Sequence, residues 1–114
     1  MKKLKPLIEA LNAKTINAPS GWEEREIKKI FASDLISDIL MTDGENILLI
    51  TSLLSDQVLR TAEVLGAVAV VLVNRRHVSG TLGKIAAKQG LPLFYTPLPK
   101  FESCVRLGQL MESA

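Results

Sequence analysis

The stretch AVAVVLVNRRHVSG, residues 67–80, decides the fold class of this chain. Its first half is apolar without interruption and rich in valine. A continuous β-branched run of this kind is typical of a strand in a parallel sheet that is covered on both faces. The run ends in Asn74, Arg75, Arg76 and His77, the only histidine of the chain. The stretch therefore predicts a central, buried strand with a polar end.

Strands and helices alternate along the rest of the chain, judged from the spacing of its apolar residues. Further strands are predicted at residues 13–19, 27–33, 47–51 and 91–96. Helices are predicted at residues 2–12, 34–41, 54–65, 79–90 and 101–111. We therefore expect a single α/β domain over residues 1–114, built as a three-layer α/β/α sandwich with a mostly parallel sheet of four to five strands.

Several helix boundaries have their own signals in the sequence. Ser33 or Asp34 is expected to cap the helix that follows them, and Ser79 is expected to cap the helix after the valine-rich strand. Gly66 and Gly90 are placed to end two helices, because glycine readily adopts the left-handed conformation of a C-terminal cap.

The composition limits the classes of protein to which the chain can belong. With 47% apolar and 23% charged residues, it is expected to fold around a core and not to be disordered. Its net charge of +2 is small and its basic residues are scattered, which argues against a nucleic-acid partner. A single cysteine excludes an internal disulfide and fits a reducing compartment.

The sequence has no segment that reaches the roughly 20 consecutive apolar residues of a membrane-spanning helix. The first stretch, MKKLKPLIEALNAK, has the basic start of a signal peptide, but Pro6 and Glu9 interrupt its apolar run. No small-residue cleavage site follows it. We therefore expect a soluble cytoplasmic protein without a membrane partner.

Catalytic and metal-binding groups are scarce in the sequence. Nucleophilic catalysis needs a nucleophile, a base and an orienting group, and only His77 and Cys104 would suit a Cys/His pair. Cys104 falls on the apolar stripe of the last helix, together with Phe101, where a buried structural thiol is expected. One histidine and one cysteine cannot complete a zinc site, which needs three or four protein ligands.

Two nucleotide-binding motifs are also missing. SGTLGK at residues 79–84 has the wrong glycine spacing for a phosphate-binding loop, and Ile85 stands where serine or threonine would hold magnesium. No GxGxxG motif follows a predicted strand. We therefore expect a protein without a metal or a cofactor, and the scarcity of catalytic groups favours a function other than that of an enzyme.

Polar residues mark the carboxyl ends of the predicted strands, which lie at the ligand-binding rim of open α/β sheets. They are Ser33, Asp34, Thr51, Ser52, Asn74, Arg75, Arg76 and Thr96. Backbone N–H groups at the helix starts favour an anion at this rim, and Arg75 or Arg76 adds a planar guanidinium group for a phosphate or carboxylate. Helix capping and solvation explain the same residues without a ligand, so both interpretations stand.

Four segments, taken in order, resemble the DRTGG domain family. They are ASDLISDILM (32–41), ILLIT (47–51), VLRTAEVLGAVAVVLVNRR (58–76) and GLPLFYTPLPKFESCVRLGQL (90–110). The resemblance implies a regulatory module, a homodimer, and a fold similar to the N-terminal domain of HPr kinase/phosphorylase. DRTGG domains occur alone or fused to paired CBS domains or phosphotransacetylases, which implies a metabolic enzyme as a partner. Lys100 stands where members often have serine or threonine.

Three functions remain open at this point. The first is a non-catalytic regulatory module that binds a small anionic ligand, such as a nucleotide, or a partner protein. The second is a small enzyme acting on a phosphorylated metabolite, which a convergence of Asp34, Asp38 and His77 would favour. The third is a structural dimerisation module, which a shallow rim without a concave pocket would favour.

Overall fold

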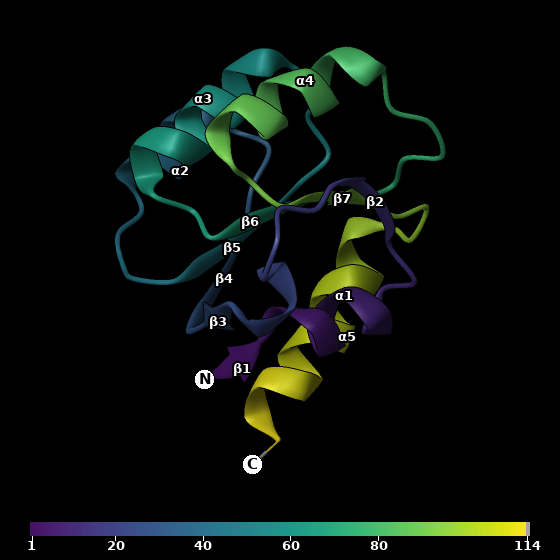
Figure 1. The fold of residues 1–114 in the computed structure, drawn as a ribbon. Helices are drawn as coiled ribbons and strands as arrows, with labels where there is room; N and C mark the ends of the chain where they lie inside the picture. The colour runs from purple at the N-terminus through teal and green to yellow at the C-terminus, as the bar shows by residue number, and fades with distance from the viewer. Residues whose placement is uncertain (114) are drawn as a thin grey trace.

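The computed structural model describes residues 1–113 and contains one five-stranded sheet between two layers of helices (Figure 1). The strands of this sheet are β2 (Lys14–Asn17), β4 (Lys29–Ala32), β5 (Ile47–Thr51), β6 (Ala69–Leu72) and β7 (Leu93–Tyr95). Their order is β2-β7-β6-β5-β4, in which β4 to β7 run parallel and β2 runs antiparallel to β7. The prediction of a mostly parallel sheet with the valine-rich strand at its centre is confirmed.

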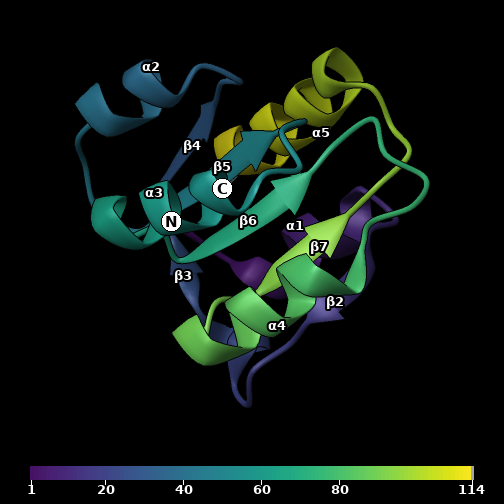
Figure 2. The ribbon, with the colours of Figure 1, turned by 90° about the horizontal axis from the view of Figure 1, so that it is seen from above.

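Helices cover both faces of this sheet. They are α1 (Leu4–Ala10), α2 (Ile36–Met41), α3 (Asp56–Leu65), α4 (Gly80–Gln89) and α5 (Lys100–Glu112). Helices α2, α3 and α4 connect successive parallel strands and lie on one face, whereas α1 and α5 lie on the other (Figures 1 and 2). Right-handed crossovers that all step in one direction along a sheet place their helices on the same face. The predicted three-layer sandwich is therefore confirmed.

The central strand β6 is buried on both faces, as its unbroken apolar sequence predicts. Val71 packs into the core cluster on the side of α1 and α5, while Val70 and Leu72 pack into the cluster on the side of α2, α3 and α4. All three side chains are completely buried. Because neighbouring side chains of a strand point to opposite faces, such a strand needs a cover on each.

A second, two-stranded sheet joins the N-terminus to the segment before β4. Strand β1 (Lys2–Lys3) pairs antiparallel with β3 (Glu26–Ile27), and the short 3-10 helix η1 (Trp22–Glu24) precedes β3. Neither strand was predicted from the sequence, which placed residues 2–3 in a helix and joined β3 to β4. Strands of two residues carry no periodicity that a sequence pattern can reveal.

The start of α2 differs from the prediction. Its N-cap residue is Leu35, which makes no side-chain capping bond. The expectation that Ser33 or Asp34 caps this helix is therefore wrong. The Ser33 hydroxyl instead accepts a hydrogen bond from the Leu35 N–H at 3.1 Å, in a turn that precedes the helix.

The caps of α3 and α4 are confirmed. The Ser79 hydroxyl accepts a hydrogen bond from the Thr81 N–H at the start of α4. Gly66 and Gly90 end α3 and α4 in the left-handed conformation, with φ of 75° and 64°. Phe101 departs from the predicted inward stripe of α5, because its side chain is 80% exposed. Within residues 1–113 no helix is both long and apolar enough to cross a membrane.

Candidate ligand-binding rim

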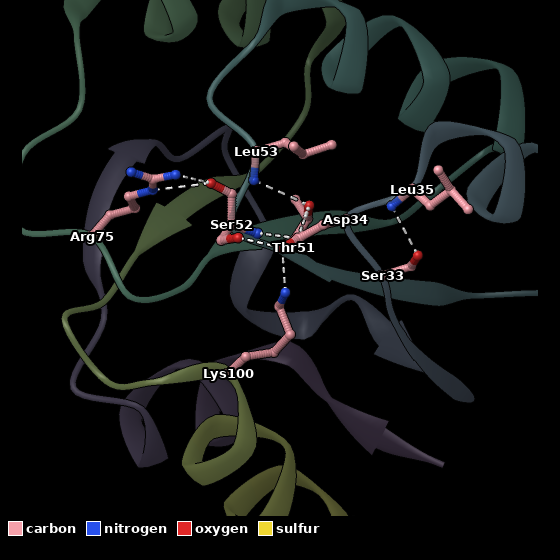
Figure 3. Close-up of polar contacts among 8 residues, drawn as sticks. All are labelled: Ser33, Asp34, Leu35, Thr51, Ser52, Leu53, Arg75 and Lys100. Carbon is pink, nitrogen blue, oxygen red and sulfur yellow. Dashed lines mark hydrogen bonds and ion pairs between the residues drawn. The ribbon is translucent and has the colours of Figure 1, made fainter.

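The carboxylate of Asp34 is the centre of a polar network at the carboxyl ends of β4 and β5 (Figure 3). Its Oδ1 accepts hydrogen bonds from the Thr51 hydroxyl at 2.9 Å and from the Ser52 N–H at 2.7 Å. Its Oδ2 accepts hydrogen bonds from the Ser52 hydroxyl and from the ammonium group of Lys100. Groups that follow two strands and begin one helix therefore meet at this carboxylate.

The register of the sheet explains why Asp34 meets Ser52. Strands β4 and β5 are parallel, and Ala32 pairs with Ile50 at their carboxyl ends. Asp34 and Ser52 lie two residues beyond this pair and so remain opposite each other. Lys100 is the first residue of α5 and reaches the same carboxylate from 66 positions further along the chain.

Arg75 extends the network to the end of β6. Its Nε and Nη2 atoms both donate to the backbone carbonyl oxygen of Ser52, at 2.9 and 2.6 Å. Asn74, directly before it, has a φ of 56°, a left-handed conformation that asparagine tolerates better than most residues. The Asn74 N–H donates to Leu98 O at 2.8 Å, and the Arg75 N–H donates to Thr96 O at 3.0 Å. This turn fixes the direction in which the Arg75 side chain leaves the strand.

The charge of Asp34 is balanced within the network. Burial raises the pKa of this carboxyl group, but the hydrogen bonds from Lys100, from the Ser52 N–H and from the Ser52 and Thr51 hydroxyls together hold it well below its usual range. The side chains of Asp34 and Lys100 remain 35% and 36% exposed. The ion pair therefore lies at the surface of the rim, within reach of a ligand.

The remaining predicted rim residues have different surroundings. The side chain of Thr96 is completely buried, and its hydroxyl donates to Leu11 O at 2.8 Å and accepts from the Leu98 N–H. It joins β7 to the end of α1 and does not face the surface. Asn74 and Arg76 are exposed beside the network, and the hydroxyl of Ser33 is engaged in its own turn.

The rim lacks the arrangement that would favour an enzyme. The groups that bond to the Asp34 carboxylate are Thr51, Ser52 and Lys100, and neither Asp38 nor His77 is among them. Both Asp38 and His77 are exposed. No cluster of three or more His, Cys, Asp or Glu side chains that could hold a metal ion occurs in the part of the chain that the structure describes.

Two cavities lie away from the rim. The larger, of about 400 Å³, is a groove between β4 and α5 that contains Cys104. Burial raises the pKa of this half-buried thiol, although Lys100 opposes the shift, so the reactive thiolate is disfavoured. The smaller cavity, of about 230 Å³, includes Gly66 and Gly90 at the C-terminal ends of α3 and α4. Neither cavity is lined by a rim residue.

Comparison with known proteins identifies a similar fold. No family model matches this chain, and no curated protein matches its sequence. Its fold is similar to the crystal structure of the CBS and DRTGG domains of the regulatory region of Clostridium perfringens pyrophosphatase, complexed with the activator diadenosine tetraphosphate. The TM-score is 0.70 at 14% sequence identity, over 94% of this chain and 46% of that chain. The chain therefore has the fold of part of a CBS and DRTGG regulatory region and spans about half of its length.

Proposed function

We propose that this protein is a cytoplasmic, non-catalytic regulatory module of the DRTGG type that binds a small anionic ligand, such as a nucleotide, at the rim. The observation that carries the proposal is the network that joins Asp34, Ser52, Arg75 and Lys100 from four separate segments of the chain. The segments that resemble the DRTGG family support it. The shared fold with a regulatory region that was crystallised with a dinucleotide activator supports it as well.

The cationic groups of the rim retain the capacity to hold an anion. The contact of Arg75 with Ser52 O uses Nε and Nη2 and leaves Nη1 for a ligand. The ammonium group of Lys100 has three N–H donors and uses one of them in the bond to Asp34. Arg76 is exposed nearby. Because Lys100 and three further donors surround the Asp34 carboxylate, its negative charge opposes an incoming phosphate less than a free carboxylate would.

The start of α4 is more favourable for this phosphate than the starts of α3 and α5, because the first turn of α5 contains Glu102. The first turn of α4 contains no acidic residue, whereas the first turn of α3 contains Asp56. A helix N-terminus favours an anion through its free N–H groups, and a carboxylate in the first turn competes for them. A phosphate bound by Arg75 and Arg76 would therefore lie on the side of α4.

A structural dimerisation module is the second candidate function. One observation favours it, because neither cavity described above is lined by a rim residue and the Asp34–Lys100 pair of the rim is partly exposed. An exposed site of this kind implies weak binding. We propose a homodimer under either function, and the dimer is the whole function if no ligand binds.

A thermal-shift screen of nucleotides and phosphorylated metabolites tests the ligand-binding function. Affinity for any hit is then measured by calorimetry on the wild type, on Arg75→Ala and on Lys100→Ala, with Lys88→Ala at the far end of α4 as a control for charge. A charge-assisted contact contributes roughly 1.5–3 kcal/mol, so each rim variant should weaken binding about tenfold or more. Equal affinity in all four proteins, or no hit in the screen, would overturn binding at the rim.

A further inference from the structure

We propose that two copies of this chain join edge to edge through β4, so that the sheet continues from one subunit into the other. This inference rests on the proposed homodimer and adds the surface on which it forms. The partner is a second copy of the chain, because the exposed features of this edge complement themselves across a two-fold axis.

Within residues 1–113, the backbone of β4 has unpaired hydrogen-bonding groups along its outer side. β4 is the last strand of the sheet, with β5 as its neighbour on one side. The N–H groups of Lys29 and Ser33 donate to carbonyl oxygens on the β5 side, those of Asn46 and Ile50. Backbone groups alternate in direction along a strand, so those of Ile30 and Ala32 point outward. An open row of this kind is a template for another strand.

The two lysines of this edge, Lys28 and Lys29, both bond within their own subunit, and the ammonium group of Lys28 pairs with Glu45 at 3.1 Å. Soluble proteins often block an edge strand with a lysine side chain that extends into solvent. Lys29 instead folds back over its own chain, where its ammonium group donates to Thr42 Oγ1 at 3.2 Å and to Asp43 O at 2.6 Å. The opposite edge strand, β2, is protected differently, because a bulge between Thr15 and Asn17 breaks its register. β4 is therefore the open edge of the two.

Exposed apolar side chains flank β4 on both faces of the sheet. On one face, α5 lines the groove against β4 with Cys104, Gly108 and Met111, and the same helix presents Phe101 at 80% and Val105 at 41% exposure. On the other face, α2 presents Met41 at 84% and Leu40 at 52% exposure. Figure 2 shows α2 and α5 on the two sides of β4. The edge thus has an apolar margin in each helical layer.

A two-fold axis perpendicular to the sheet, between the two Phe31 residues, satisfies these features. The two β4 strands then run antiparallel, and Ile30 exchanges its outward N–H and C=O groups with Ala32 of the partner subunit. The side chains of Ile30 and Ala32 both line the groove, so the axis makes them cross-strand neighbours. Such an axis also keeps each helical layer beside its own copy, which gives an isologous interface.

A stable dimer needs an extended surface on each subunit. An interface of standard size buries about 800 Å² on each partner, roughly one eighth of the 6123 Å² that the chain exposes. Such an interface would need the edge of β4 together with the flanks of α2 and α5. The chain contains only 3 phenylalanines, and Phe101 is exposed on this side. Aromatic side chains of this type are frequent anchors of protein interfaces.

Sedimentation equilibrium on the wild type and three variants tests the inference. Phe101→Glu places a charge in the apolar margin, and Ala32→Pro removes an outward N–H group without affecting the bonds between β4 and β5. Val64→Glu is the matched control, because Val64 is a 78% exposed apolar residue on α3. The dimer dissociation constant should rise about tenfold or more in the first two variants and remain unchanged in the control. Circular dichroism checks that each variant is folded.

The homodimer and its β4 surface would be contradicted by different results. A wild type that sediments as a 12.5 kDa monomer at all concentrations would overturn the homodimer itself. A wild-type dimer that Phe101→Glu and Ala32→Pro leave as tight as before would overturn only the β4 surface. If Ala32→Pro does not fold, Phe101→Glu decides the question alone, because its side chain is exposed in the monomer.

Discussion

The middle of β6 and its carboxyl end differ in what holds them in place. Val70 and Val71 are completely buried, and any apolar side chain of similar size and shape would satisfy their surroundings. A few residues later, Arg75 is held by Ser52 O and by a turn that Asn74 makes against the segment after β7. The burial of the middle follows from local sequence, whereas the geometry of the end requires partners from other strands. A change in the middle should therefore affect folding, and a change at the end should affect binding.

The largest effect is expected from a charge in the middle of β6. Val71→Asp places an unpaired carboxylate in the core cluster beside α1 and α5. Its cost is several kcal/mol against a total stability of about 5–15 kcal/mol, so the domain should unfold. Thermal melting followed by circular dichroism measures this. The matched variant Val64→Asp, at an exposed position, should melt like the wild type, and the same result for Val71→Asp would contradict the core assignment.

A smaller effect is expected from the carboxylate at the rim. Asp34→Asn removes the charge that Lys100 and the two hydroxyls bind. A loss of about 1 kcal/mol in the free energy of unfolding is expected, below the usual contribution of charge-assisted bonds because solvent screens a partly exposed pair. Urea denaturation at pH 7 measures it, with the exposed Asp38→Asn as control. A loss of unfolding free energy as large as that of Val71→Asp would show that the rim is essential for folding.

The same pair of proteins makes a prediction about pH. The pKa of Asp34 is lower in the folded protein than in the unfolded chain, so its contribution to stability is complete above the ordinary carboxyl pKa of about 3.9. It is lost as the pH falls below that value toward the folded pKa. The difference between the wild type and Asp34→Asn should therefore be constant from pH 7 to about 5 and shrink in more acidic solution. Urea midpoints across this range would contradict the assignment if the difference did not depend on pH.

An effect no larger than that of Asp34→Asn concerns the turn that orients Arg75. Asn74 has a left-handed backbone, so Asn74→Ala should cost about 1 kcal/mol of stability, while Asn74→Gly should cost less. Urea denaturation compares the two variants. An alanine variant as stable as the glycine variant would mean that this turn relaxes without strain.

The fold could be predicted from the sequence because its signals are local. The valine-rich run, the caps at Ser79, Gly66 and Gly90, and the alternation of strands with helices all depend on residues close together in the chain. The exposure of Phe101 could not be predicted in this way, because helical spacing places a residue on a face without showing what covers that face.

The candidate site could be predicted only in part. In open α/β sheets, ligands bind at the carboxyl ends of the strands, and this rule predicted Asp34, Ser52 and Arg75 as site residues. Lys100 was missed as a member, because only the path of the chain from β7 to α5 brings it to Asp34. Thr96 ends a strand like the others, but its hydroxyl turns inward to Leu11 O, and no pattern of polarity reveals that direction.

The central claim, that the rim is the ligand-binding surface, is tested most directly by a backbone amide NMR titration. Diadenosine tetraphosphate and ATP serve as probes, with inorganic phosphate as a control for the charge alone. We expect the largest chemical-shift changes at the amides of Asp34, Ser52, Arg75 and Lys100, and we expect Arg75→Ala to remove them. Amide signals that stay unchanged at high nucleotide concentration would contradict binding at the rim. Changes concentrated around Gly66 and Gly90, in the smaller cavity, would contradict it as well.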